Sequence, residues 1–230
     1  MAAPDSQTQG CAWENRSELG LVNAYWVTLK QCLIETRDFA AGCRGSADYW
    51  SPVLFALISV VIGLAGTQLW AELKDWAIGD IKNPYALRMK MIVHNLTLLP
   101  LVCQAGSAIL IQSILEVVVS HWTMKRLSPQ HYTGLRATWS VYFYALGATT
   151  VLGVLPFVGN AFAVVWRPIV LALGFAEAHR VRMYVAIAGV LAIAATGEIV
   201  KIAISTLSLF LGMGDALSWG DILRFLLGTM

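Results

Sequence analysis

The sequence predicts an all-α integral membrane protein with five transmembrane helices and an amino-terminal amphipathic interfacial helix. Of the 230 residues, 57% are hydrophobic and 13% are charged, whereas roughly 25% are charged in a soluble globular domain. The mean hydropathy is +0.64. Residues 137–166 contain no charged side chain, and this run exceeds the roughly 20 apolar residues that a helix needs to cross a bilayer.

Composition divides the chain into three parts. Residues 1–50 form a polar segment that we expect in the cytosol, residues 51–202 form the five-span domain, and residues 203–230 form an apolar carboxyl-terminal tail. The first residues lack the basic and apolar regions of a cleavable signal peptide. We therefore expect the first span to act as the insertion signal.

Five apolar runs are predicted to span the membrane. Their approximate limits are Pro52–Trp70, Asn95–Val119, Thr138–Phe157, Ala161–Ala178 and Met183–Ile202. The third and fourth runs come from the long uncharged stretch. Residues 156–160 interrupt this stretch with proline, glycine and asparagine, which favour a turn. We therefore expect a helical hairpin that turns at Gly159-Asn160 on the outer side. The sequence stays apolar after Lys201, so the fifth helix could continue into the tail.

Lysine and arginine residues predict the orientation, because cytoplasmic loops carry an excess of both. With the amino terminus in the cytoplasm and the carboxyl terminus outside, nine of them lie on the inner side: Arg16, Lys30, Arg37, Arg44, Lys125, Arg126, Arg136, Arg180 and Arg182. The loop between the first two spans carries Lys74, Lys82, Arg88 and Lys90 and weakens the bias.

Apolar residues from Leu19 to Leu33 recur at helical spacing, and they include Val22, Trp26 and Leu29. This stripe predicts an amphipathic helix. It suits a helix lying in the membrane interface with its aromatic residues on the buried side. The stripe fits equally well a helix that packs on the inner loops of the protein, because a helix in either environment needs one apolar face.

No catalytic, cofactor or metal site is expected. The four cysteines, at positions 11, 32, 43 and 103, have no Cys-x-x-Cys spacing and no nearby histidine that would complete a zinc site. His121, His131 and His179 lie in or beside loops, whereas haem ligation needs two buried histidines at matching depth. A net charge of +2 with scattered basic residues gives no reason to expect a nucleic-acid partner.

Several motifs follow one another along the chain in a recognisable order. Near the amino terminus these are Trp13-Glu14-Asn15-Arg16, Leu19-Gly20 and Thr28-Leu29-Lys30, followed by Ser51 to Leu57 at the entry to the first span. Leu155-Pro156-Phe157-Val158-Gly159 with Trp166 forms the predicted hairpin, and Gly174 to His179 forms the junction before the last span. Taken together in this order, from about Trp13 to Gly197, the motifs resemble the prokaryotic type of the Yip family of polytopic membrane proteins.

The resemblance implies five spans in the cytoplasmic (inner) membrane of a prokaryote, a cytosolic amino terminus and no enzymatic activity. Eukaryotic relatives bind Rab-type GTPases, but their amino-terminal signatures are absent from this sequence. GTPase binding is therefore not carried over. Two departures are Ala12, where the family has a proline, and Arg167, which places a charge inside the fourth span.

Charged residues within the predicted spans are the first candidates for function, because each costs about 2.5–3.5 kcal/mol on insertion scales. Arg167 could extend to the outer headgroups, pair with Glu116 or Glu198, or bind an anionic lipid or substrate. Glu198 and Lys201 are three residues apart, which favours an intrahelical ion pair. A proton or ion path is the alternative for that pair.

Six residues are candidates for contact with a partner or lipid: Arg167, Trp13, Trp26, His179, Arg180 and Arg182. We expect His179 to face the headgroups together with its two arginine neighbours. The small-residue stretches at 63–67, 145–149 and 186–197 are expected to pack helices within the chain, and a surface for a helix of another protein is the alternative.

These features favour a non-enzymatic membrane scaffold or accessory subunit. Its expected partners are membrane lipids and other integral membrane proteins of a larger complex. The alternative is a transporter or channel subunit with a polar path around Arg167, Glu116 and Glu198.

Overall fold

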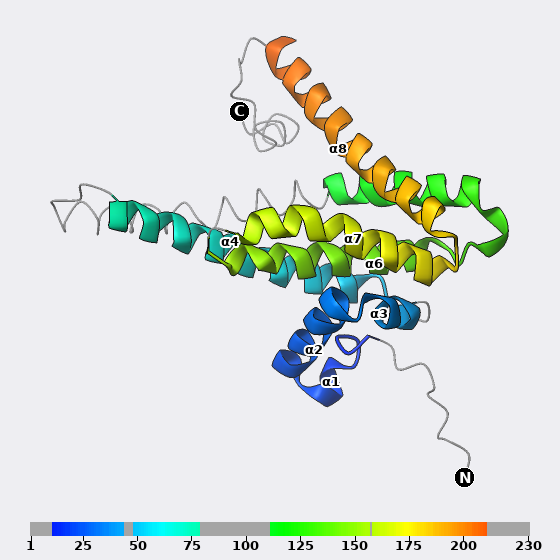
Figure 1. Cartoon of the computed structure of the whole chain (residues 1–230), viewed down its shortest axis with the longest axis horizontal. Helices are drawn as coiled ribbons and strands as arrows, with labels where there is room; N and C mark the ends of the chain where they lie inside the picture. Colours follow the sequence, from blue (N-terminus) through cyan, green and yellow to red (C-terminus); the bar gives the residue numbers. More distant parts are fainter. Residues whose placement is uncertain (1–10, 44–47, 79–110, 157, 211–230) are drawn as a thin grey trace.

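A computed structural model describes residues 11–43, 48–156 except 79–110, and 158–210, and the regular elements in these ranges are all helices (Figure 1). Three short helices come first: α1 (Arg16–Leu19), α2 (Leu21–Ile34) and α3 (Thr36–Gly42). The long helices are α4 (Trp50–Ile78), α6 (Leu135–Thr150), α7 (Gly159–His179) and α8 (Met183–Phe210). Residues 111–127 are also helical, and two 3-10 turns occur, η2 (Pro129–His131) and η3 (Val151–Val154).

Among the described residues, three stretches are long and apolar enough to cross a membrane: Trp50–Trp70 in α4, Gly159–His179 in α7 and Met183–Ala203 in α8. The prediction of an all-α chain with membrane-spanning helices is confirmed to this extent for the described residues. Most of the predicted second span, 95–119, lies outside the described residues, and its last part belongs to the helix of residues 111–127.

The predicted third span, 138–157, is shorter in the structure. The 16 residues of α6 rise about 24 Å, which is less than the roughly 30 Å thickness of the hydrocarbon layer. The predicted hairpin is present, but its turn comes earlier than Gly159-Asn160. The chain turns through η3 and the residues that follow it, and Gly159 is already the first residue of α7. Glycine is needed there because a Cβ atom would overlap the carbonyl oxygen of Leu152.

The α6 helix lies at the centre of the fold. Tyr142 and Tyr144 point to opposite sides of it, because each helical residue turns by about 100°. The hydroxyl oxygen of Tyr142 lies 3.3 Å from Ser113 Oγ in the helix of residues 111–127. The ring of Tyr144 lies 5.2 Å from Phe39 of α3 and 5.3 Å from Phe55 of α4, between ring centres. Most of α6 is buried between these two groups of helices.

Helices α1 to α3 pack along the side of the long helices instead of beyond their ends (Figure 1). The hydroxyl groups of Tyr25 and Ser59 hydrogen-bond at 3.0 Å. The indole N–H of Trp166, near the middle of α7, donates to the carbonyl of Leu33 at 3.1 Å. The polar segment of residues 1–50 therefore shares, over its described part, one hydrophobic core with the helices that follow it.

The amphipathic α2 helix packs on the protein and also keeps an exposed apolar edge. Its buried side chains are Ala24, Tyr25, Thr28, Leu29 and Cys32. The exposed edge includes Val22, Trp26 and Ile34, of which Trp26 is 60% exposed. The buried side of α2 packs on the sides of α4, α6 and α7. The predicted packing partners were the inner loops of the protein. Contact of the exposed edge with the membrane interface stays a prediction.

Glycine residues allow α4 to approach α6 and η3 closely. A Cβ atom on Gly66 would lie 2.8 Å from the Cα of Val154, and one on Gly147 would lie 2.9 Å from the Cα of Ala56. A Cβ atom on Gly63 would overlap the carbonyl oxygen of Thr150. The prediction that the small-residue stretches pack helices within the chain is therefore confirmed for 63–67 and 145–149.

Helices α4, α6 and α8 run in one direction, and α7 runs in the opposite direction. The indole N–H of Trp139, at the start of α6, donates to the carbonyl of Tyr49, next to the start of α4, at 3.0 Å. His179, at the end of α7, hydrogen-bonds to Thr138 in the first turn of α6 at 3.0 Å. Hence α4, α6 and α8 begin at one end of the fold, where α7 finishes. We call it the basic end, because it gathers Lys125, Arg126, Arg136, Arg180 and Arg182.

The last helix is longer than predicted. α8 continues through residues 203–210, which composition had assigned to the carboxyl-terminal tail. This extension stays apolar, so nothing in the sequence interrupts the helix after Lys201. In Figure 1 the second half of α8 projects away from the other helices. Residues 211–230 lie outside the described residues.

Candidate functional site

Three polar side chains from three helices meet beside the middle of α6. The Nη2 atom of Arg167 lies 3.3 Å from Glu116 Oε2 and donates to the Tyr142 hydroxyl at 2.7 Å. The Tyr142 hydroxyl in turn donates to Glu116 Oε2. The guanidinium carbon also lies 5.4 Å from the centre of the Tyr142 ring. We call these three residues the Arg167 cluster.

Glu116 is buried, and donors occupy both of its carboxylate oxygens. Oε1 accepts from Gln112 Nε2, one turn earlier in the same helix, at 2.7 Å. Oε2 accepts from Tyr142 and Arg167. Of the roles considered for Arg167, the structure therefore shows pairing with Glu116. Removing one member of such a buried pair costs about 3–5 kcal/mol, because the other charge is left uncompensated.

Glu198 and Lys201 form the predicted intrahelical ion pair, with 2.6 Å between Lys201 Nζ and Glu198 Oε1. Their side chains are about two-thirds exposed. The pair borders one cavity of about 470 Å³ together with Arg167 and Glu116, between the helix of residues 111–127, α6, α7 and α8. The polar residues of the proposed path, Arg167, Glu116 and Glu198, are thus brought to one place.

The two arginine neighbours of His179 predict an exposed side chain, but the structure places His179 in the interior. The side chain is fully buried, and its Nδ1 and Nε2 atoms lie 2.8 Å from Thr133 Oγ1 and 3.0 Å from Thr138 Oγ1. Its ring stacks on Tyr132 at 4.6 Å. The predicted lipid or partner contact of His179 is therefore wrong for this arrangement. Trp13 is also fully buried, which removes it from the contact candidates.

The hydrogen bonds of His179 define its tautomer. Thr133 Oγ1 also lies 2.9 Å from the carbonyl of Ala178, which can only accept. The single hydroxyl hydrogen of Thr133 goes to that carbonyl, so Thr133 accepts from Nδ1–H. In the neutral imidazole the proton is therefore on Nδ1, and Nε2 accepts from Thr138.

The other contact candidates, Trp26, Arg180 and Arg182, are exposed. Arginine residues also pair with aromatic rings at the basic end. The guanidinium of Arg126 lies 4.9 Å from the Trp122 ring centre, and that of Arg136 lies 5.0 Å from the Tyr49 ring centre. Basic and aromatic side chains together are typical of a membrane–water interface.

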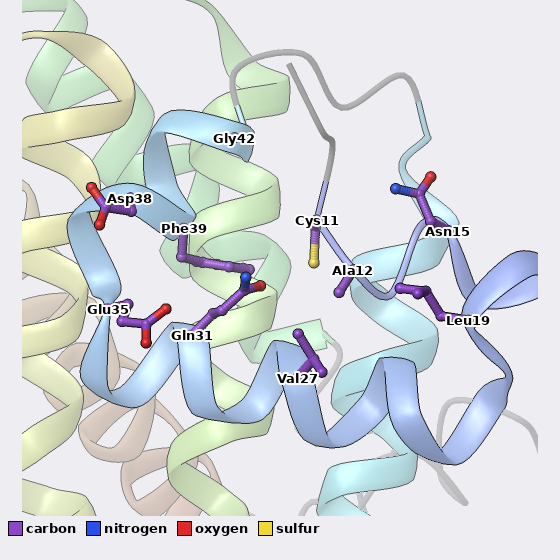
Figure 2. Close-up of a pocket in the computed structure, with 10 residues that line it drawn as sticks. All are labelled: Cys11, Ala12, Asn15, Leu19, Val27, Gln31, Glu35, Asp38, Phe39 and Gly42. Carbon is purple, nitrogen blue, oxygen red and sulfur yellow. The ribbon is translucent and has the colours of Figure 1, made fainter. Parts of the chain in front are cut away.

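A second pocket, of about 360 Å³, lies within the amino-terminal helices. Figure 2 shows Gln31 of α2 and Phe39 of α3 extending toward one another, with Cys11 among the other lining residues. Cys11, Cys32 and Cys43 are free and buried, and burial raises the pKa of each thiol. In the described part of the chain, no cluster of histidine, cysteine or acidic residues could hold a metal ion.

Comparison of the chain with protein-family models, curated proteins and solved structures found no match. The resemblance to the Yip family stays a prediction.

Proposed function

We propose that this protein is a non-enzymatic, Yip-like integral membrane scaffold or accessory subunit that binds partner membrane proteins or lipids. The observation that carries the proposal is the apolar surface along the described helices. On α7 this surface includes Val164 and Val165, and on α8 it includes Leu191 and Ile199, each more than 60% exposed. The exposed edge of α2 adds Trp26 beside these spans.

Site-specific photocrosslinking tests this proposal. A benzophenone amino acid replaces Trp26 or Leu191, and irradiated membranes are analysed by mass spectrometry. We expect covalent adducts with particular membrane proteins or lipids. The same amino acid at Ser17, an exposed polar position of α1, is the matched control and should give few adducts. A protein that stays free of adducts at all positions and purifies alone after mild extraction would contradict the proposal.

We further propose that the protein lies in a prokaryotic inner membrane with the basic end facing the cytoplasm. The excess of lysine and arginine on cytoplasmic loops supports this orientation. In a cysteine-free background, Gln130→Cys and Leu155→Cys place single thiols at opposite ends of the fold, at exposed positions. An impermeant maleimide should label Leu155→Cys in intact cells and Gln130→Cys only after permeabilisation. The reverse pattern would overturn the orientation.

A second candidate function is transport, and the convergence of the Arg167 cluster on a cavity supports it. Ionisable residues within membrane-spanning bundles mark proton and ion pathways in many transporters. Liposomes loaded with a pH-sensitive dye would detect proton flux. We expect Glu116→Gln to abolish that flux, while Lys201→Gln retains most of it. Flux equal to that of empty liposomes would exclude this candidate.

A further inference from the structure

The cavity beside Arg167 combines charged groups with apolar walls. Its volume is about 470 Å³, and its cationic residues are Arg167 and Lys201. Leu171 and Val190 are among its apolar residues. Such a combination suits a ligand that is polar at one end and apolar along the rest, because a pocket fixes orientation with a few polar groups.

Arg167 keeps hydrogen-bond donors that the cluster does not use. One nitrogen, Nη2, serves both Glu116 and Tyr142. A guanidinium has five N–H groups on three nitrogens, and Nε and Nη1 have no hydrogen-bond partner among the residues that the structure describes. The side chain of Arg167 is 32% exposed and borders the cavity. These donors are therefore available to a ligand.

The acceptors of the cavity are mostly occupied. Three donors already occupy the oxygens of Glu116, and Lys201 engages one oxygen of Glu198. The hydroxyl group of Thr150 donates to a carbonyl of its own helix at 2.7 Å. Arg167 and Lys201 therefore keep spare N–H donors at the cavity, and the Glu116 carboxylate is already engaged. A ligand that brings acceptor oxygens is favoured over one that brings donors.

The surroundings of the cavity are apolar. Val164 borders the cavity and is 75% exposed on α7. Because α7 and α8 are long and apolar enough to cross a membrane, a cavity between them is next to hydrocarbon. A ligand from that layer carries an acyl chain.

We infer that this cavity binds an anionic amphiphile. A carboxylate or phosphate head accepts hydrogen bonds from Nε and Nη1 of Arg167, and Lys201 can donate to it with the N–H groups that its pair with Glu198 leaves free. The acyl chain lies between α7 and α8. The inference specifies the lipid class in the proposed function and rests on the membrane placement proposed there. The head could belong to a free fatty acid or to a membrane lipid with a terminal phosphate.

Photolabelling of the full chain in phosphatidylcholine nanodiscs tests the inference. The probes are a diazirine palmitate, a diazirine phosphatidic acid and, as a neutral control, a diazirine monoacylglycerol. We expect the anionic probes to label α7 and α8 residues of the cavity and unlabelled palmitate or phosphatidic acid to compete. Labelling by palmitate alone identifies a free fatty acid as the ligand, and labelling by phosphatidic acid alone identifies a membrane lipid; both results support an anionic amphiphile.

Two kinds of variant separate the cavity from its charges. Ala194→Phe fills the cavity and should reduce anionic labelling about ten-fold, whereas Ala195→Phe, an exposed neighbour that does not border the cavity, should not. The double variant Arg167→Gln with Glu116→Gln leaves no unpaired charge. It should also weaken anionic labelling about ten-fold, because charge-assisted hydrogen bonds are lost.

Two outcomes would overturn the inference. One is labelling of the cavity by the neutral probe that equals labelling by the anionic probes. The other is equal anionic labelling of Ala194→Phe and Ala195→Phe. Neither outcome depends on the photocrosslinks at Trp26, so failure of the lipid site and failure of the scaffold proposal are distinguishable.

Discussion

The indole N–H of Trp166 donates a hydrogen bond to the carbonyl of Leu33 at 3.1 Å, across 133 residues of sequence. This contact joins the end of α2 to the middle of α7. Beside it, Glu35, Arg37 and Asp38 line a shallow cavity together with Trp166. Charged side chains of the amino-terminal helices therefore lie level with the middle of a helix that is apolar enough to span a membrane.

Loss of this hydrogen bond should loosen the amino-terminal helices. Trp166→Phe keeps an aromatic ring but removes the donor, at a net cost of about 1 kcal/mol. Cys11, Cys32 and Cys43 are buried in these helices, so we expect maleimide to label them about five-fold faster. The measurement uses Cys103→Ser protein. Trp122→Phe, at the basic end, is the control, and equal labelling rates in the two variants would refute the prediction.

Gly66 should tolerate no larger residue. A Cβ atom there would lie 2.8 Å from the backbone of Val154, so Gly66→Val forces α4 away from η3. We expect a loss of about 1–3 kcal/mol, seen as a lower midpoint of thermal unfolding in detergent. Ala65→Val, at an exposed position of α4, serves as the matched control. An unchanged midpoint for Gly66→Val would argue against this packing.

The hydrogen bonds of His179 predict both a tautomer and a stability effect. Nitrogen NMR of histidine-labelled protein should show the proton on Nδ1. Thr138→Val removes the donor to Nε2 and should cost about 1–3 kcal/mol, because a buried acceptor is left unsatisfied. Thr123→Val is the control, since Thr123 donates only to a carbonyl of its own helix. A proton found on Nε2 would contradict the assigned hydrogen-bond directions.

Stability should fall in acid through Asp48. Its carboxylate accepts from the backbone N–H of Trp50 at 2.8 Å and from Ser51, and these bonds lower the pKa of Asp48 below its usual 3.8. Because the folded pKa is the lower one, the contribution is complete above the unfolded value and is lost as pH falls through the folded value. Asp48→Ala should cost about 1 kcal/mol at pH 7, as expected for a helix cap.

Unfolding measured between pH 7 and pH 2 tests the role of Asp48. Asp48→Asn keeps a capping side chain but cannot titrate, so it should lose less stability in acid than the natural protein. Identical acid dependence of the two proteins would mean that another group is responsible.

The parts of the site that were predictable from the sequence depend on local spacing. Glu198 and Lys201 are three apart on one helix, so their pairing needs no knowledge of the fold. The choice between Glu116 and Glu198 as the partner of Arg167 depends on how helices pack, which spacing does not encode. Tyr142 was missed, although a phenol in a long uncharged run indicates that a buried hydroxyl needs a partner.

The environment of His179 was also not predictable. Two neighbouring arginines are typical of an exposed helix end, and Arg180 is indeed exposed. The histidine is buried because Thr133 and Thr138, more than 40 residues earlier, supply hydroxyl groups to both ring nitrogens. Such long-range pairing has no signature in a single sequence.

The contact between Trp166 and Leu33 also sets an order for biogenesis. At about 5–20 residues per second, the ribosome needs on the order of 10 s to synthesise α7 after α2 has formed. Over that interval the amino-terminal helices lack their docking surface on α7, and the three thiols lack part of their cover. Protection of these thiols from maleimide in pulse-labelled nascent chains would then report when the fourth predicted span packs against the amino-terminal helices.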